Sequence, residues 1–142
     1  MKLITCAALL IGALMASGVR SAETTQLSIQ EARFVSLGGI DQWITIRGVE
    51  RDAPVLLWVH GGPADVQSPL VSVYESWAQR FTLVQWDQRG AGKTFGKNAG
   101  PASEVSLDRI AQDGIELVEY VRQQLRVSKI VLAGHSWGTV VG

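Results

Sequence analysis

The chain contains 142 residues, of which 46% are hydrophobic and 18% are charged, and its 13 basic side chains balance 13 acidic ones. This composition is typical of one globular domain and excludes a disordered chain, a collagen-like repeat and a coiled coil. A net charge of zero offers no basic surface, so neither nucleic acid nor anionic lipid is expected as a partner. One cysteine, Cys6, excludes an intrachain disulfide and a cysteine-based metal site, and two histidines are too few for a histidine-rich site, so no metal or cofactor is expected.

The first 22 residues have the layout of a secretory signal peptide. Lys2 precedes Leu3–Ala16, an uncharged run that fits the ~7–15 residues of a signal-peptide core and falls short of the ~18 needed for a membrane span. We therefore expect a secreted or periplasmic protein, cleaved after Gly18, Ser21 or Ala22, with a mature domain over residues 23–142 and no stable membrane span after cleavage. A buried core helix is the alternative interpretation of this segment.

Two β-rich runs beyond the leader predict a hairpin. Arg33–Leu37 and Gln42–Arg47 are separated by Gly38-Gly39, and glycine tolerates the positive φ angles of a tight turn. Alternation along the second run puts Ile44 and Ile46 on one face, which we expect to be buried.

Three further apolar runs predict strands that are covered on both faces, as in a parallel sheet: Val55–Val59, Phe81–Trp86 and Lys129–Ala133. Helices are expected between them, over Leu70–Arg80 and after Ser106, which can cap a helix N-terminus. The second helix carries an apolar stripe at helical spacing, formed by Leu107, Ile110, Ala111, Gly114, Leu117, Val118, Val121 and Leu125. This order of elements predicts an α/β fold with a mostly parallel sheet.

The most specific motif is Gly134-His135-Ser136-Trp137-Gly138, which directly follows the last predicted strand. It matches the Gly-x-Ser-x-Gly nucleophile elbow, in which a sharp strand-to-helix turn exposes the serine hydroxyl and the flanking glycines let strand and helix approach. Ser136 is therefore the candidate nucleophile. The alternative is a glycine-rich turn with an ordinary capping serine.

A second motif, His60-Gly61-Gly62-Pro63, follows the strand Val55–Val59. A serine that attacks a carbonyl needs N–H donors for the developing oxyanion, and a glycine loop can present them without obstruction. Pro63 has no N–H, so we favour Gly62 over Gly61 as one donor, and Trp137 as the other. We expect His60 to brace the loop and not to act as the base; a simple tight turn is the alternative.

The third motif, Asp87-Gln88-Arg89-Gly90-Ala91-Gly92-Lys93-Thr94, follows the strand Phe81–Trp86. Its end resembles a phosphate-binding P-loop, but Asp87 stands where that motif requires glycine, and a carboxylate repels phosphate. The residues after Thr94 are expected to form a loop where a P-loop requires a helix. We therefore favour a structural role in which Asp87 and Arg89 brace the loops above the sheet.

Taken together, His60–Pro63, Asp87–Gly92 and Gly134–Gly138 resemble the α/β-hydrolase superfamily, and within it the prolyl iminopeptidase-like hydrolases, over Phe34–Gly142. The sequence departs from that subgroup at Ala64, where glycine is usual, and at Thr94, where serine or a similar residue is usual. These differences weaken the expectation of proline specificity more than that of serine hydrolysis. The resemblance implies Ser136 as nucleophile, Gly62 and Trp137 as oxyanion-hole donors, and Asp87–Gly90 as the loop after the fourth strand.

In the family order, the triad acid and then the histidine follow the nucleophile. Only Trp137–Gly142 follow Ser136, and they contain neither residue type. His60 matches the oxyanion loop and His135 adjoins the serine, so neither is expected to serve as the base. The sequence thus predicts the N-terminal portion of a longer α/β-hydrolase, incomplete at its C-terminus and inactive alone.

The expected parent is a serine hydrolase that cleaves a small peptide, amide or ester through an acyl-enzyme, with an aminopeptidase favoured. A non-catalytic binding module or pseudoenzyme of the same fold is the main alternative, and a P-loop nucleotide binder is a remote one. Substrate choice cannot be read from Gly-His-Ser-x-Gly, which serves many substrates, and no oligomeric state is indicated.

Overall fold

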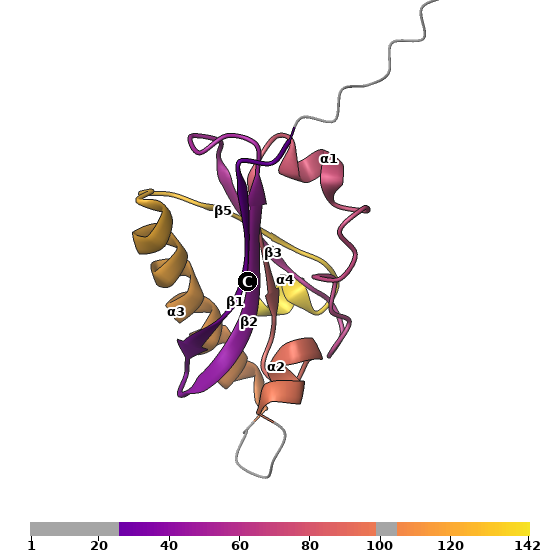
Figure 1. The fold of residues 1–142 in the computed structure, drawn as a ribbon. Helices are drawn as coiled ribbons and strands as arrows, with labels where there is room; N and C mark the ends of the chain where they lie inside the picture. Colours follow the sequence, from indigo (N-terminus) through magenta and orange to yellow (C-terminus); the bar gives the residue numbers. More distant parts are fainter. Residues whose placement is uncertain (1–25, 99–104) are drawn as a thin grey trace, which may run out of the picture.

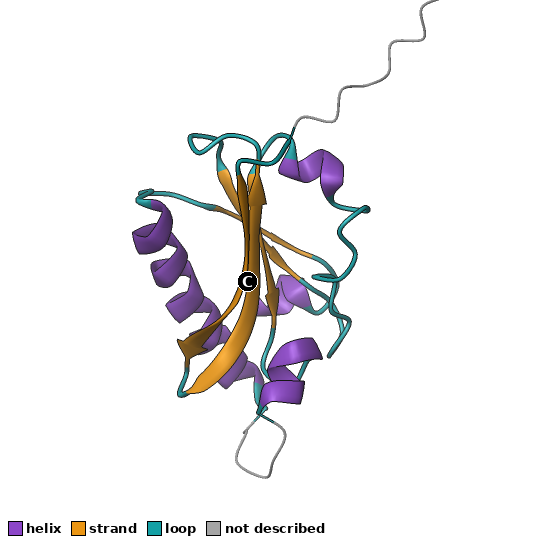
Figure 2. Cartoon of the chain, in the orientation of Figure 1, coloured by secondary structure: helices purple, strands orange, loops and turns teal. Residues whose placement is uncertain are grey.

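The computed structural model describes residues 26–98 and 105–142, in which one five-stranded sheet is ordered β1-β2-β4-β3-β5. The helix α3 covers one face, whereas α1 and α2 lie on the other side (Figures 1 and 2). The predicted signal peptide falls outside the described residues. Within them, no helix is long and apolar enough to cross a membrane.

The predicted hairpin is confirmed and is longer than expected, with β1 at Ile29–Leu37 and β2 at Ile40–Gly48. Gly38 and Gly39 adopt φ angles of +56° and +77° in the turn. Ile44 and Ile46 are fully buried, as the alternation predicted. The strands extend beyond the β-rich runs because antiparallel pairing continues to the last residue of each strand.

Three strands, β3 (Val55–Val59), β4 (Thr82–Asp87) and β5 (Val131–Gly134), are parallel to one another, and β4 also pairs antiparallel with β2. The sheet is therefore mixed: a hairpin at one side and parallel strands at the other. Every residue of β4 is buried, because neighbouring strands flank it and helices lie on both sides of the sheet. The carboxyl ends of β3, β4 and β5 lie at the same edge, and all three predicted motifs begin there.

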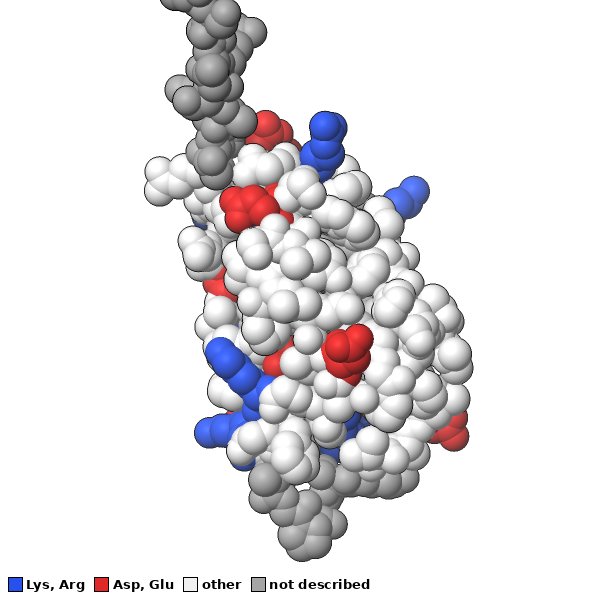
Figure 3. Space-filling model, turned by 90° about the vertical axis from the view of Figure 1, so that its right-hand side faces the viewer, with Lys and Arg blue, Asp and Glu red and all other residues white. Residues whose placement is uncertain are grey.

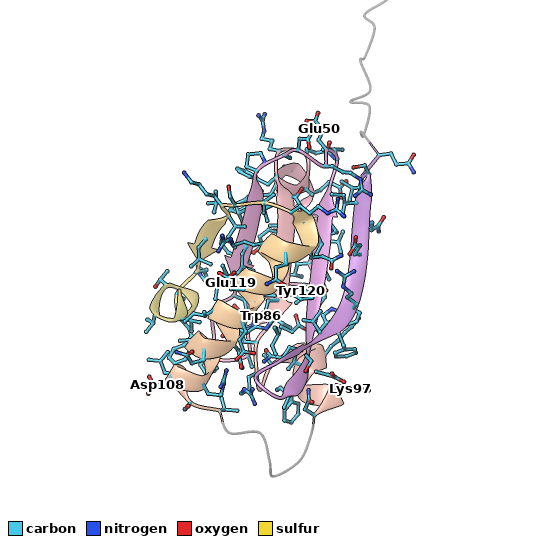
Figure 4. The ribbon with its side chains drawn as sticks, turned by 90° about the vertical axis from the view of Figure 1, so that its left-hand side faces the viewer. Glu50, Trp86, Lys97, Asp108, Glu119 and Tyr120 are labelled. Carbon is cyan, nitrogen blue, oxygen red and sulfur yellow. The ribbon has the colours of Figure 1, made fainter. Side chains whose placement is uncertain are left out.

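The helix α3 (Leu107–Leu125) begins where the sequence predicted, because the Ser106 hydroxyl accepts a hydrogen bond from the Arg109 N–H at 3.2 Å. Figure 4 shows α3 lying across the sheet over Trp86. A Cβ on Gly114 would lie 3.7 Å from the Trp86 ring, an ordinary van der Waals distance, so this part of α3 packs directly over the ring. Most of the stripe packs into the core, including Ile110, Leu117 and Val121, whereas Leu107 is 40% exposed.

The helix expected over Leu70–Arg80 is only partly present, as α1 (Glu75–Ala78). Residues 67–74 instead form successive turns whose N–H groups donate to the carbonyl three residues back, such as Tyr74 to Val71 at 3.2 Å. The Gln67 side chain accepts hydrogen bonds from Trp58 and Tyr74, which fixes this segment against β3. Trp58 and Gln67 both lie outside the predicted helix, so its apolar stripe could not reveal these contacts.

The loop expected after Thr94 is also wrong, because a short helix, α2, occupies Gly92–Lys97. The Asp87 carboxylate accepts a hydrogen bond from the Lys93 N–H at 2.9 Å in the first turn of this helix. A carboxylate is favourable at a helix N-terminus, and here it comes from the end of β4 and not from an adjacent cap. Gly92 and Gly96 lower the helix propensity of this segment, so local propensity does not predict the helix.

Candidate active site

The nucleophile motif forms a tight strand-to-helix turn between β5 and α4 (Gly138–Val141). Ser136 is exposed and has a φ of +52°, a left-handed conformation that is rare for a residue with a side chain. A Cβ on Gly134 would lie 2.6 Å from the Gly138 carbonyl carbon, and one on Gly138 would lie 2.8 Å from the His60 carbonyl oxygen. Both glycines are therefore required by the close packing of the turn, as an elbow demands.

The glycine loop after β3 lies against this turn. The His135 N–H donates to the Val59 carbonyl at 3.2 Å, which ties the two loops together. A Cβ on Gly61 would lie 3.4 Å from the Ser136 Cβ, so the loop passes directly beside the serine. Gly62 has a φ of +135°, which a residue with a side chain rarely adopts.

The expected oxyanion donors are available for a ligand in this geometry. Among the described residues, no protein oxygen accepts a hydrogen bond from the N–H of Gly62 or of Trp137. Pro63 has no N–H to offer, and Gly61 is buried. Within the described residues, the N–H groups of Gly62 and Trp137 are therefore not engaged by protein oxygens, which an oxyanion-hole donor requires.

His60 is buried inside the loop, and both of its ring nitrogens have partners. Nε2 accepts from the Gln88 N–H at 3.2 Å, and Nδ1 lies 2.7 Å from the Gly61 carbonyl. Burial lowers the pKa of His60, which favours its neutral form. Because both nitrogens already have partners, the ring cannot take a proton from Ser136 in this arrangement. His135 is exposed at the elbow, with its Nδ1 3.0 Å from the position that a Gly61 Cβ would occupy.

The loop after β4 connects several segments through Asp87. One oxygen of its carboxylate accepts from the Ser68 hydroxyl at 2.6 Å, and the other accepts from the Lys93 N–H at 2.9 Å. The Asp87 carbonyl also accepts from the Thr94 hydroxyl at 2.6 Å. One residue thereby holds the end of β4, the start of α2 and the segment after β3 together.

Arg89 connects the same loop to α3 and to the hairpin. Its guanidinium donates to both carboxylate oxygens of Asp113, at 2.7 and 3.1 Å, and to the Gly38 carbonyl at 2.8 Å. The two paired side chains are 4% and 0% exposed. Arg109 adds a second cation to Asp113 at 2.9 Å and also pairs with Glu116.

The P-loop resemblance does not extend to a phosphate site. A Cβ on Gly92 would lie 2.8 Å from the Asp87 carboxyl carbon, so a carboxylate already occupies the space at the start of α2. Lys93 Nζ lies 3.9 Å from the centre of the Trp43 ring, and the Thr94 hydroxyl also accepts from the Trp43 N–H at 2.8 Å. The Lys93 ammonium and the Thr94 hydroxyl, which a P-loop would direct to the phosphates and their magnesium ion, are therefore engaged within the protein.

Sequence reasoning missed the contributions of Gln88, Ser68, Asp113 and Arg109 to this region. Asp113 was detectable in principle, because an acidic residue beside Ile110 and Leu117 on the buried side of α3 requires a cationic partner. Gln88 and Ser68 left no such signal, since their partners come from other loops. In residues 26–98 and 105–142, no group of three or more histidine, cysteine, aspartate or glutamate side chains could hold a metal ion.

Comparison with known proteins agrees with this geometry. The profile of the family described as "alpha/beta hydrolase fold" matches residues 54–142. "Probable aminopeptidase YbaC" of Bacillus subtilis is 36% identical over 115 residues, covering 80% of this chain and 36% of that protein. "Probable proline iminopeptidase" of Streptomyces coelicolor is 34% identical over 85 residues, covering 59% and 25%.

Solved structures show the same relationship. A proline iminopeptidase-related protein of Thermus thermophilus superposes with a TM-score of 0.63 at 26% identity, covering 79% of this chain and 38% of that one. An epoxide hydrolase of Vigna radiata gives 0.60 at 26% identity, covering 80% and 33%. The chain spans about a quarter to a third of the length of its curated relatives. It is a member of the α/β-hydrolase fold family, related to proline iminopeptidases and aminopeptidases.

Proposed function

We propose that this chain is the nucleophile-bearing part of a serine hydrolase that cleaves an amide or ester through an acyl-enzyme. The observation that supports the proposal is the exposed Ser136 at φ +52°, set beside the glycine loop that follows β3. A left-handed serine on a tight strand-to-helix turn is strained, and such strain is characteristic of functional positions. A capping serine in an ordinary turn would not require it.

The proposed chemistry begins when the Ser136 oxygen attacks the substrate carbonyl. A C–O bond forms, the carbonyl electrons move to oxygen, and the Gly62 and Trp137 N–H groups stabilise the resulting oxyanion. A general base removes the serine proton and delivers it to the leaving group as the acyl-enzyme forms. Water then attacks the acyl carbonyl, which releases the acid product and regenerates the serine.

We further propose that the base and its acidic partner come from chain beyond Gly142, and that residues 1–142 alone do not turn over substrate. The proposal is supported by the family order of nucleophile, acid and histidine. It is also supported by His60, whose ring nitrogens are both engaged in the loop. Without a base, a serine hydroxyl is a weak nucleophile.

The proposed substrate is a small peptide whose N-terminal residue is released. The support comes from the relatives, which are named aminopeptidases and proline iminopeptidases. The departures at Ala64 and Thr94 leave the preferred residue open. A panel of aminoacyl anilides, with nitrophenyl esters for comparison, would identify it; turnover of esters with no anilide cleaved would contradict the aminopeptidase assignment.

The test of the nucleophile uses the full reading frame of the gene, expressed with a purification tag. A fluorophosphonate probe should label the wild type on Ser136 and should not label Ser136→Ala. The control is Ser36→Ala, which changes an exposed serine of β1 and should label normally. A Ser136→Ala protein that kept its activity would refute the assignment.

We also propose that the protein is exported, either secreted or periplasmic. The proposal is supported by Leu3–Ala16, an uncharged run preceded by Lys2 and followed by small residues. The N-terminus of the mature protein should begin at Val19, Ala22 or Glu23. Recovery of protein with an intact leader from the cytoplasmic fraction alone would contradict it.

A further inference from the structure

The loop after β4 meets the glycine loop after β3 through one residue, Gln88, which is only 2% exposed. Its neighbours on both sides are fixed by charged hydrogen bonds. The Asp87 carboxylate holds Ser68 and the start of α2, and the Arg89 guanidinium holds Asp113. Gln88 therefore has little freedom to move.

Gln88 makes two hydrogen bonds to His60. Its backbone N–H donates to His60 Nε2 at 3.2 Å, and its side-chain amide donates to the His60 carbonyl at 2.9 Å. Because Nε2 accepts, the proton of the neutral ring resides on Nδ1, which then donates to the Gly61 carbonyl at 2.7 Å. Gln88 thus holds both the ring and the backbone of the first residue of the glycine loop.

This contact adjoins the nucleophile turn on its other side. The His60 carbonyl that Gln88 contacts lies 2.8 Å from the position that a Cβ on Gly138 would occupy. Gly61, the next residue, passes beside Ser136, and the proposed donor Gly62 follows. A shift of His60 would therefore change the position of the Gly62 N–H relative to the serine oxygen.

We propose that Gln88 is the positioning residue of the oxyanion loop: its paired bonds to His60 set where the Gly62 N–H points. The proposal rests on the serine-hydrolase function proposed above. An oxyanion donor acts mainly on the transition state, and misplacing it lowers kcat with little change in KM. Gln88 is not expected to touch the substrate, so its effect is transmitted entirely through His60.

The test is Gln88→Met in the full-length gene product, since methionine is similar in size and cannot donate to the His60 carbonyl. We expect kcat to fall about tenfold or more, below the ~100–1000-fold loss of a whole donor, and KM to change less than about twofold. If KM rose while kcat stayed unchanged, the proposal would be overturned.

The matched control is Gln42→Met. Gln42 is also fully buried and donates to a backbone carbonyl, that of Leu37, at 3.1 Å, and it accepts from Trp86 at 2.8 Å. Gln42→Met removes two bonds on the α3 side and should lower Tm at least as much as Gln88→Met while leaving kcat within about twofold. Equal losses of kcat in both variants would attribute the effect to general destabilisation and would refute the proposal.

Two further measurements keep the outcome clear. If Gln88→Met does not fold, Gln88→Asn retains the amide on a shorter side chain that no longer reaches the His60 carbonyl, and it should show the same loss of kcat. Nitrogen-15 NMR of the glycine loop requires no catalysis: the backbone amide signals of His60, Gly61 and Gly62 should shift in Gln88→Met, which no longer donates to the His60 carbonyl, and should stay in place in Gln42→Met. Unchanged amide signals of His60, Gly61 and Gly62 overturn the positioning role even if Ser136 proves not to be the nucleophile, whereas failure of fluorophosphonate labelling refutes only the proposed function.

Discussion

Gly138 shows how closely a single residue controls the nucleophile turn. A Cβ on Gly138 would lie 2.8 Å from the His60 carbonyl oxygen, and this contact is with backbone that cannot rotate away. We expect Gly138→Ala to destabilise the protein by about 1–3 kcal/mol, the usual effect of forcing an extra carbon into packed structure. Gly96→Ala is the control, because Gly96 lies in α2 with nothing within 4 Å, and it should be neutral or stabilise by up to about 1 kcal/mol. Urea denaturation of both variants measures the difference, and equal effects would contradict the packing argument.

His60 predicts a specific dependence of stability on pH. Burial lowers its pKa in the folded state below the usual value of about 6.5, so the unfolded state binds the proton more readily. The stability that His60 contributes through this pKa difference is fully present above about pH 6.5. It is lost as the pH falls through the lowered pKa of the folded state. We expect the free energy of unfolding to decrease between pH 7.5 and pH 5, and to decrease less in His60→Asn. Identical slopes in the two proteins would show that His60 does not titrate on unfolding.

Some helices and strands could be predicted from the local sequence alone, and others could not. The strands and α3 were predicted because apolar runs and the Ser106 cap are local signals. The expectation that the last strand is covered on both faces was wrong, because Val131 and Leu132 of β5 are 47% and 45% exposed. The nucleophile turn was also predicted from a local signal, since its glycines flank Ser136 in the chain. By contrast, α2 depends on a carboxylate from the end of β4, and the positioning contact of Gln88 joins two loops. The Gln88 contact spans 28 residues, so no local window contains it, whereas Asp87 lies six residues before Lys93 but outside the ordinary cap position of a helix.

Helix α3 carries a prediction of its own, because Asp113 is fully buried on its inner side against Arg89. Asp113→Ala leaves a buried cation unpaired, which costs about 3–5 kcal/mol. Glu119→Ala is the control on the exposed side of the same helix, where the pair with Arg122 is solvent-accessible and contributes at most about 0.5 kcal/mol. Thermal unfolding should rank the two variants in that order. A loss of less than 1 kcal/mol in Asp113→Ala would mean that Arg89 regains solvent or another partner.

At the scale of the whole molecule, the sheet brings three loops to one edge, and each performs a different task. The loop after β5 holds Ser136, the loop after β3 holds Gly62, and the loop after β4 fixes their relative position through Gln88. Parallel strands make this possible because their carboxyl ends coincide, which is where ligands bind in open α/β sheets. The face with α1 and α2 is mostly uncharged, with a few acidic and basic side chains scattered over it (Figure 3).

The strand β5 is an edge of the sheet within the described part of the chain, and Val131 and Leu132 are 47% and 45% exposed. An exposed apolar edge strand is a template for pairing with another chain. We expect residues 26–142, expressed alone, to associate at micromolar concentration in sedimentation velocity, and Val131→Lys to reduce that association because a charge blocks edge pairing. Val73→Lys is the control, since Val73 is 63% exposed but lies in a turn, and it should leave association unchanged. If both lysines acted equally, net charge and not the strand edge would govern association; if neither acted, the contact would lie elsewhere on the surface.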